Sequence, residues 1–167
     1  MDALEALLTR RSVRHFLPDA IPREVMEAIL CAAMYAPSAD NAQPWRFVVI
    51  TDRAKLETIP RFQPWSNMLK EAPAAVVVCG NTEKQPEYWV QDCAAATQNL
   101  LLAAHASGLG GVWLAIYPNQ ARMDGLRKLL NLPTEISPLC VVALGYPRGK
   151  LPKVDRYRAD FVHYNEW

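Results

Sequence analysis

The most informative stretches of the sequence are two short motifs: Arg10-Arg11-Ser12-Val13-Arg14, and Pro37-Ser38-Ala39-Asp40-Asn41-Ala42-Gln43-Pro44-Trp45. The first places three guanidinium groups and a hydroxyl within five residues, and these are the donors that a phosphate accepts. The second is a polar segment bounded by prolines, between an apolar helical stripe and an apolar strand. Its neutral side chains can hydrogen-bond to carbonyls and ring nitrogens without adding charge. Together the two stretches indicate a site for a phosphorylated, planar, polar ring.

Each stretch also has a simpler interpretation. Arg10 and Arg14 are four residues apart, which is one helical turn if the preceding helix continues through them. Cations stabilise the C-terminal end of a helix, so the arginines can equally be a solvated helix end. The Pro37–Trp45 segment can equally be an ordinary turn whose side chains cap the backbone. Spacing alone leaves these interpretations open.

The hydrophobic pattern predicts alternating helices and strands. Helices are expected over 2–11, 22–35, 52–59, 87–107 and 120–130, and strands over 46–51, 74–79, 111–117 and 139–144. Residues 60–73 contain three prolines and are expected to be irregular. The alternation favours an α/β or α+β layered domain spanning residues 1–167. Because no G-x-G-x-x-G turn follows the first strand, a separate dinucleotide-binding fold is not expected.

Composition narrows the class of protein. The apolar fraction of 51% is high for 167 residues and favours an oligomer. The net charge of +1 argues against a nucleic-acid partner. The four cysteines form no Cys-x-x-Cys pair and the three histidines are far apart, so no metal site is expected. Since no signal peptide or membrane-spanning apolar run is visible, we expect a cytoplasmic protein without a membrane partner.

Four short motifs follow one another along the chain. They are Arg10-Arg11-Ser12-x-Arg14-x-Phe16, Pro37-Ser38-x-x-Asn41-x-Gln43-Pro44-Trp45, Gly108-Leu109-Gly110-x-Val112-Trp113 and Gly145-Tyr146-Pro147. Each motif is weak alone, whereas the four in this order and spacing resemble compact members of the FMN-dependent nitroreductase family. The resemblance implies an α+β fold of three layers (α/β/α), with a central mixed sheet flanked by helices. It also implies an intertwined homodimer that exchanges its C-terminal tails.

The resemblance further implies tightly bound FMN in a site built from both subunits. The implied cofactor-binding residues are Arg10, Arg11, Ser12, Arg14, Pro37, Ser38, Asn41, Gln43, Leu114, Ala115, Ile116, Lys153 and Arg156. The first four would contact the phosphate, the ribityl chain and the pyrimidine edge. Pro37, Ser38 and Asn41 would come from the partner subunit and cover one face of the ring, with Gln43 nearby. The backbone of Leu114, Ala115 and Ile116 would pass along the ring near N5. Lys153 and Arg156 in the tail would complete the phosphate site, with Arg158 as an alternative to Arg156.

The implied activity is that of an FMN-dependent oxidoreductase with NAD(P)H as co-substrate. A small electron-poor acceptor, such as a nitroaromatic or a quinone, would be reduced in a ping-pong cycle. Because the cofactor performs the redox chemistry, we nominate no catalytic side chain. Three alternatives remain: a same-fold enzyme for dehalogenation or flavin fragmentation, a flavin-binding sensor or storage module without efficient turnover, and an anion-binding domain without flavin.

Two other features carry expectations. Asp92 lies inside the long apolar helical pattern, so its carboxylate is expected to bond a nearby arginine or a backbone group. The tail from Arg148 to Trp167 is first basic and then aromatic, and we expect it to dock on the partner subunit.

Overall fold

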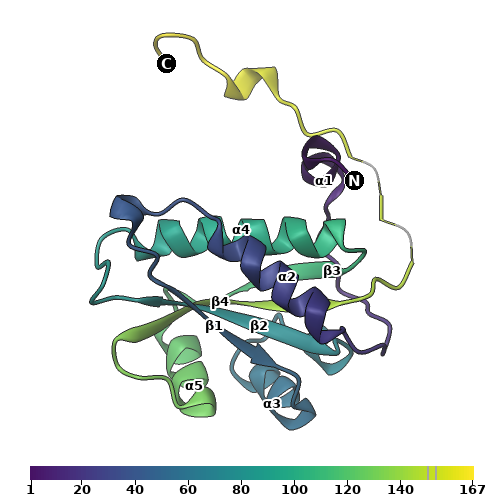
Figure 1. The fold of residues 1–167 in the computed structure, drawn as a ribbon, viewed down its shortest axis with the longest axis vertical. Helices are drawn as coiled ribbons and strands as arrows, with labels where there is room; N and C mark the ends of the chain where they lie inside the picture. Colours follow the sequence, from purple (N-terminus) through teal and green to yellow (C-terminus); the bar gives the residue numbers. More distant parts are fainter. Residues whose placement is uncertain (150, 153) are drawn as a thin grey trace.

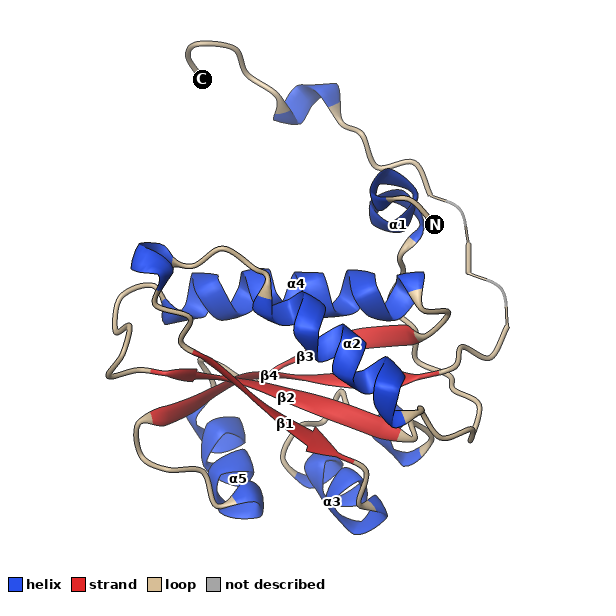
Figure 2. Ribbon diagram, in the orientation of Figure 1, coloured by secondary structure: helices blue, strands red, loops and turns tan. Residues whose placement is uncertain are grey.

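The computed structural model describes residues 1–149, 151–152 and 154–167. Its helices and strands in chain order are α1 (Ala3–Thr9), α2 (Arg23–Met34), β1 (Trp45–Ile50), α3 (Arg53–Thr58), β2 (Ala74–Asn81), α4 (Trp89–Ala106), β3 (Gly110–Ala115), α5 (Gln120–Leu130) and β4 (Ile136–Gly145). Figures 1 and 2 show the sheet between two helical layers, with α2 and α4 on one face and α3 and α5 on the other. The predicted three-layer α+β architecture is therefore confirmed. No helix in the described part of the chain is long and apolar enough to cross a membrane.

The sheet of the described chain has the strand order β1-β2-β4-β3, and each neighbouring pair is antiparallel. The expected mixed sheet is therefore wrong for these strands. Within the described residues, parallel pairing is limited to an isolated bridge between Ser12 and Gly111. The sequence did not reveal this, because strands covered by helices on both faces are apolar throughout, whichever way their neighbours run.

Two apolar cores lie on opposite faces of the sheet. Along β2, Val76 and Val78 pack under α2 and α4, whereas Ala75 and Val77 pack against the layer that contains α3 and α5. This alternation follows from the two-residue period of a strand. The central strands β2 and β4 are buried almost throughout, which leaves β1 and β3 as the edges of the sheet.

Glycines connect α4 to β3 and bring the arginine-rich segment alongside. Gly108 has a φ of 79°, and the N–H of Leu109 donates to the carbonyl of Ala104 at 2.9 Å, which closes the helix as predicted. A Cβ atom at Gly110 would lie 2.5 Å from Cγ2 of Val13. Glycine at this position therefore allows the segment containing Val13 to lie directly on the start of β3.

Helix α1 ends earlier than predicted, at Thr9 instead of residue 11. Arg10 is already extended, with φ −57° and ψ 134°, so Arg10 and Arg14 are not one helical turn apart. The N–H of Val13 donates to the carbonyl of Gly111 at 3.0 Å. This pairing with β3 overrides the helical preference of the arginines, because tertiary contacts readily outweigh propensity.

The C-terminal tail extends away from the body of the molecule beyond α1 (Figure 1). Tyr157, Phe161, Tyr164 and Trp167 are all at least 75% exposed, and Trp167 is 99% exposed. The tail therefore buries little of its apolar surface against its own chain.

Candidate cofactor site

Cationic side chains converge just beyond the end of α1. Partial burial, the neighbouring Arg156 of the tail and then Arg11 lower the pKa of Arg10. Within the described part of the chain, the Arg10 side chain makes no hydrogen bond or ion pair. Guanidinium groups held close together favour an anion, and their forked donors match a phosphate.

Arg11 has a different role from Arg10. Its Nη1 donates to the carbonyls of Leu8 at 2.9 Å and Arg10 at 2.7 Å, so it closes the end of α1. The helix-end interpretation, left open above, therefore applies to this arginine. Its Nε is buried and has no partner among the described residues, so this N–H remains a donor for an additional group.

The structure distinguishes Arg156 from Arg158, the two tail arginines considered for the phosphate site. Arg158 is bound to Asp160 through Nε and Nη2, each at 3.1 Å, and its guanidinium lies 5.2 Å from the centre of the Phe161 ring. Arg156, in contrast, acts electrostatically on Arg10. Of the two, Arg156 is therefore the better placed to join the predicted phosphate site. Lys153 lies outside the described residues.

His105 on α4 reports on the charge of this cluster. Its Nε2 lies 2.8 Å from Oγ1 of Thr9, and burial together with Arg10 and Arg11 lowers its pKa below the ordinary 6.5. An anion bound to the arginines removes part of the repulsion, so we expect FMN to raise the pKa of His105.

The check is an NMR titration of the His105 ring with and without saturating FMN, with His105→Gln to assign the signal. A ligand that raises a pKa binds the protonated form more tightly. At a pH between the His105 pKa of the free protein and that of the complex, FMN binding should therefore be accompanied by proton uptake. An unchanged His105 pKa at full saturation would place the phosphate elsewhere.

The outer edge of β3 presents backbone groups to the ring part of the candidate site. The carbonyl of Ala115 accepts from Nε2 of Gln63 at 2.7 Å and from Nη1 of Arg122 at 3.2 Å. In an antiparallel strand the N–H and C=O of one residue point to the same side, so the Ala115 N–H also faces outward. The N–H of Ile116 is already bonded to Leu139 at 3.1 Å, and Leu114 pairs inward with β4. Of the three predicted backbone positions, Ala115 is the one that offers a donor.

A cavity of about 540 Å³ brings Arg14 together with this edge of β3. The predicted residues Arg14, Leu114 and Ala115 all line it. Three lining residues that sequence reasoning missed are Gln63, Asn67 and Arg122. Gln63 is buried at 2% exposure although the segment around it is irregular in sequence, and its partner Ala115 is 52 residues away. No local pattern could have identified that pairing.

The polar loop of residues 37–44 does not line this cavity in its own chain. It lies beyond the N-terminal end of α4, on the helical layer formed by α2 and α4 (Figure 1). Oγ of Ser38 accepts from the N–H of Gln43 at 3.0 Å, and Nε2 of Gln43 donates to Oδ1 of Asn41 at 2.8 Å. Gln43 thus braces Asn41, while the Ser38 hydroxyl hydrogen and the Asn41 amide hydrogens stay available to a ligand. Pro37 is exposed at the start of the loop.

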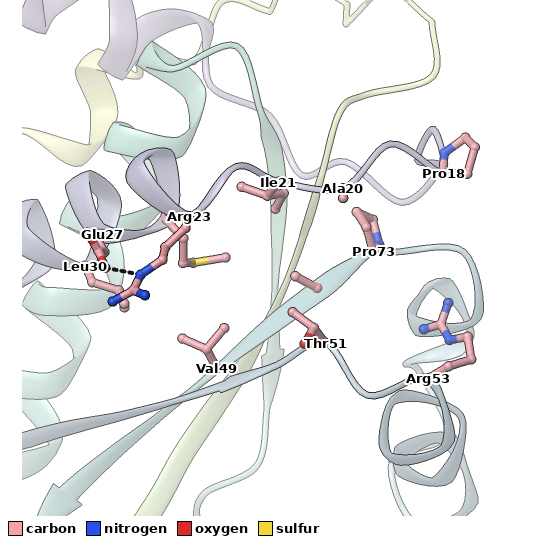
Figure 3. Close-up of a pocket in the computed structure, with 12 residues that line it drawn as sticks. Pro18, Ala20, Ile21, Arg23, Glu27, Leu30, Val49, Thr51, Arg53 and Pro73 are labelled. Carbon is pink, nitrogen blue, oxygen red and sulfur yellow. Dashed lines mark hydrogen bonds and ion pairs between the residues drawn. The ribbon is translucent and has the colours of Figure 1, made fainter.

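A second cavity, of about 630 Å³, lies between the N-terminal end of α2 and the edge strand β1 (Figure 3). Ile21, Leu30, Val49 and Pro73 give it a largely apolar lining. It contains none of the predicted cofactor residues, so it is separate from the candidate cofactor site.

Known proteins match this chain over nearly its whole length. The family model for the Nitroreductase family matches residues 7–146. A Methanothermobacter thermautotrophicus protein, provisionally named NADH dehydrogenase/NAD(P)H nitroreductase, is 44% identical over 169 residues, covering 100% of this chain and 88% of the relative. A solved structure from Parabacteroides distasonis with the same provisional name has a TM-score of 0.96 and 43% identity, covering 98% of each chain. Oxidised iodotyrosine deiodinase bound to FMN and 3-iodo-L-tyrosine has a TM-score of 0.84 at 28% identity, covering 98% of this chain and 99% of that one. On its sequence and its fold, this chain belongs to the nitroreductase family.

Proposed function

We propose that this protein is an FMN-dependent NAD(P)H oxidoreductase that reduces small electron-poor acceptors, such as nitroaromatics and quinones. The observation that carries the proposal is the pairing of two features along one segment. The arginine-rich segment runs from a cationic cluster at Arg10 to a cavity that is lined by both Arg14 and Ala115. A molecule that joins a phosphate to a planar ring with polar edges matches both ends: the phosphate matches the cationic cluster, and the ring matches the cavity.

The residues present fit FMN. Arg10, Ser12 and Arg156 would hold the phosphate together with the unpartnered Nε of Arg11, and Lys153 is proposed here from the family resemblance. When bound, FMN supplies the redox chemistry, and the protein supplies binding and electrostatics. Arg14 would stabilise negative charge at the pyrimidine edge of the ring. The Ala115 N–H would fix the orientation of the ring at N5, between the backbones of Leu114 and Ile116.

We further propose a homodimer in which each site uses both subunits. The 37–44 loop does not reach the Arg14 cavity of its own chain, so its donors, Ser38 and Asn41, would serve the partner's cofactor. Exposed leucines along α1 (Leu4, Leu7 and Leu8) and the exposed aromatic tail also require a covering surface. The apolar cavity beside the free edge of β1 (Figure 3) is where we propose that the partner's tail docks.

The catalytic cycle is proposed to be ping-pong. NAD(P)H would bind over the open face of the ring, be oxidised and leave, and the acceptor would then bind in the same place. Trp65 and Trp113 give the cavity aromatic surface for planar substrates. The names of the relatives support a nicotinamide donor, and the deiodinase relative supports reductive dehalogenation as an alternative chemistry for this fold.

The visible absorption spectrum of the purified protein, reconstituted with FMN and then mixed anaerobically with NADH or NADPH, tests the proposal. We expect flavin bands that bleach with at least one donor and return on addition of a nitroaromatic or a quinone. Bands that persist with both donors would favour a sensor or storage module. Bands that bleach but return only with a halogenated phenol would favour dehalogenation, and a protein that takes up no FMN would contradict the proposal outright.

A further inference from the structure

The loop of residues 37–44 is held in an unfavourable backbone conformation. Asp40, Asn41 and Gln43 have φ values of 52°, 52° and 48°. This left-handed region crowds the Cβ atom against the backbone, and a long side chain such as that of Gln43 is uncommon there. Several such residues close together persist only where the surrounding structure holds them, and they gather at ligand-binding sites.

Hydrogen bonds within the loop explain only part of its stability. The N–H of Asn41 donates to the carbonyl of Ser38 at 3.1 Å, and Oγ of Ser38 accepts from the N–H of Gln43. These bonds shape the turn. The end of the loop is attached to β2, where the N–H of Asn81 donates to the carbonyl of Pro44 at 2.8 Å. The start of the loop is attached to α4, because Oδ1 of Asp92 accepts from the N–H of Ala39 at 3.0 Å. Asp92 thus bonds a backbone group, as the sequence analysis predicted.

Asp92 is an unusual residue for its place in the helix. It is only 5% exposed, and it lies beside the buried side chains of Trp89, Cys93 and Ala96 on α4. Its second oxygen, Oδ2, is shielded from solvent and has no partner among the described residues. A buried carboxylate with an unpaired oxygen lowers stability, so the packing of α4 alone would favour an apolar residue. The contact with Ala39 is therefore the reason in the structure for a carboxylate at this position.

We propose that Asp92 is a positioning residue, whose buried carboxylate holds the 37–44 loop in the conformation that presents Ser38 and Asn41 to the partner subunit's cofactor. This inference rests on the FMN site proposed above. Asp92 itself touches neither the cofactor nor a substrate. It acts through the Ala39 N–H, which sets the start of the strained turn.

Two substitutions separate the hydrogen bond from the packing. Asp92→Asn keeps a carbonyl oxygen to accept from Ala39, whereas Asp92→Leu has nearly the same shape and no acceptor. Asp124→Asn, at an exposed position on α5, is the matched control for removal of a carboxylate. Hydrogen exchange of the Ala39 amide in the flavin-free protein reports on the loop, and FMN titration of the same variants reports on the site.

We expect Asp92→Leu to expose the Ala39 amide to exchange and to raise the FMN Kd by at least about tenfold, the effect of removing one buried hydrogen bond. The Asn variant and the control should stay within about threefold of the natural protein on the same scale. The Leu variant should keep the melting temperature of the natural protein or exceed it. A residue with a merely structural role would instead lower the melting temperature in the Leu variant.

A double-mutant cycle with Ser38→Ala completes the test. If Asp92 acts through the loop, Asp92→Leu and Ser38→Ala weaken FMN binding less than additively when combined. Full additivity, unchanged FMN affinity in the Leu variant, or a protected Ala39 amide in that variant would each overturn the inference. Failure of the natural protein to bind FMN would overturn the proposed function and with it the role of Asp92 toward a cofactor, whereas amide exchange would still show whether the carboxylate holds the loop.

Discussion

Replacing Arg10 with alanine is expected to release FMN and to leave the folded protein intact. The Arg10 side chain makes no hydrogen bond or ion pair within the described residues, so its loss removes no polar contact from the fold. The pKa of Arg10 is lowered by burial and by the positive charges of Arg156 and Arg11. A bound anion would offset the repulsion between these charges. A charge-assisted hydrogen bond to a phosphate contributes about 1.5–3 kcal/mol, so the FMN Kd should rise about 10- to 150-fold.

The measurement is a fluorescence titration of FMN into Arg10→Ala and into Arg61→Ala as the control. Arg61 is also a helix-associated arginine, but it is exposed and lines neither the Arg14 cavity nor the apolar cavity beside β1. Circular dichroism and the melting temperature should match in all three proteins. If Arg10→Ala binds FMN as tightly as the natural protein does, the phosphate lies elsewhere and the assignment of this cluster is wrong.

Truncation of the chain after Lys150 is expected to weaken both the dimer and FMN binding. The deletion removes Arg156, which lies close enough to Arg10 to affect its pKa, and Val154, whose carbonyl is 3.5 Å from Nη2 of Arg11. It also removes the exposed aromatic residues that we propose dock on the partner. With the phosphate cation and the subunit contact both lost, the FMN Kd should rise by at least about 100-fold.

Two further variants separate these effects. Arg156→Ala should weaken FMN binding and leave the dimer intact by analytical ultracentrifugation. A variant with Tyr157, Phe161, Tyr164 and Trp167 all changed to serine should dissociate more readily and keep the phosphate cation. A truncated protein that remains a stable, fully flavinated dimer would contradict the role proposed for the tail.

Local patterns in the sequence determined much of the fold. The apolar run of β1 and the capped helix α5 lie within about one residue of their predicted limits, because short-range periodicity and caps set both. The closure of α4 at Gly108 was predictable for the same reason, since glycine adopts a positive φ without strain. The four motifs that carry the family resemblance can be recognised from the sequence alone, because their residue types and spacing do not depend on where the segments lie in the fold.

The tertiary structure decided which of these residues meet. Pairing with β3 ended α1 at Thr9 and separated Arg10 from Arg14, which then reached different parts of the candidate site. The bonds from Gln63 to Ala115 and from Asp92 to Ala39 join residues 52 and 53 positions apart. The antiparallel order of the sheet was equally hidden, because a strand buried on both faces is apolar in either direction. Periodicity and capping depend on neighbours within a few residues, whereas the candidate site depends on hydrogen bonds that form only after distant segments have packed together.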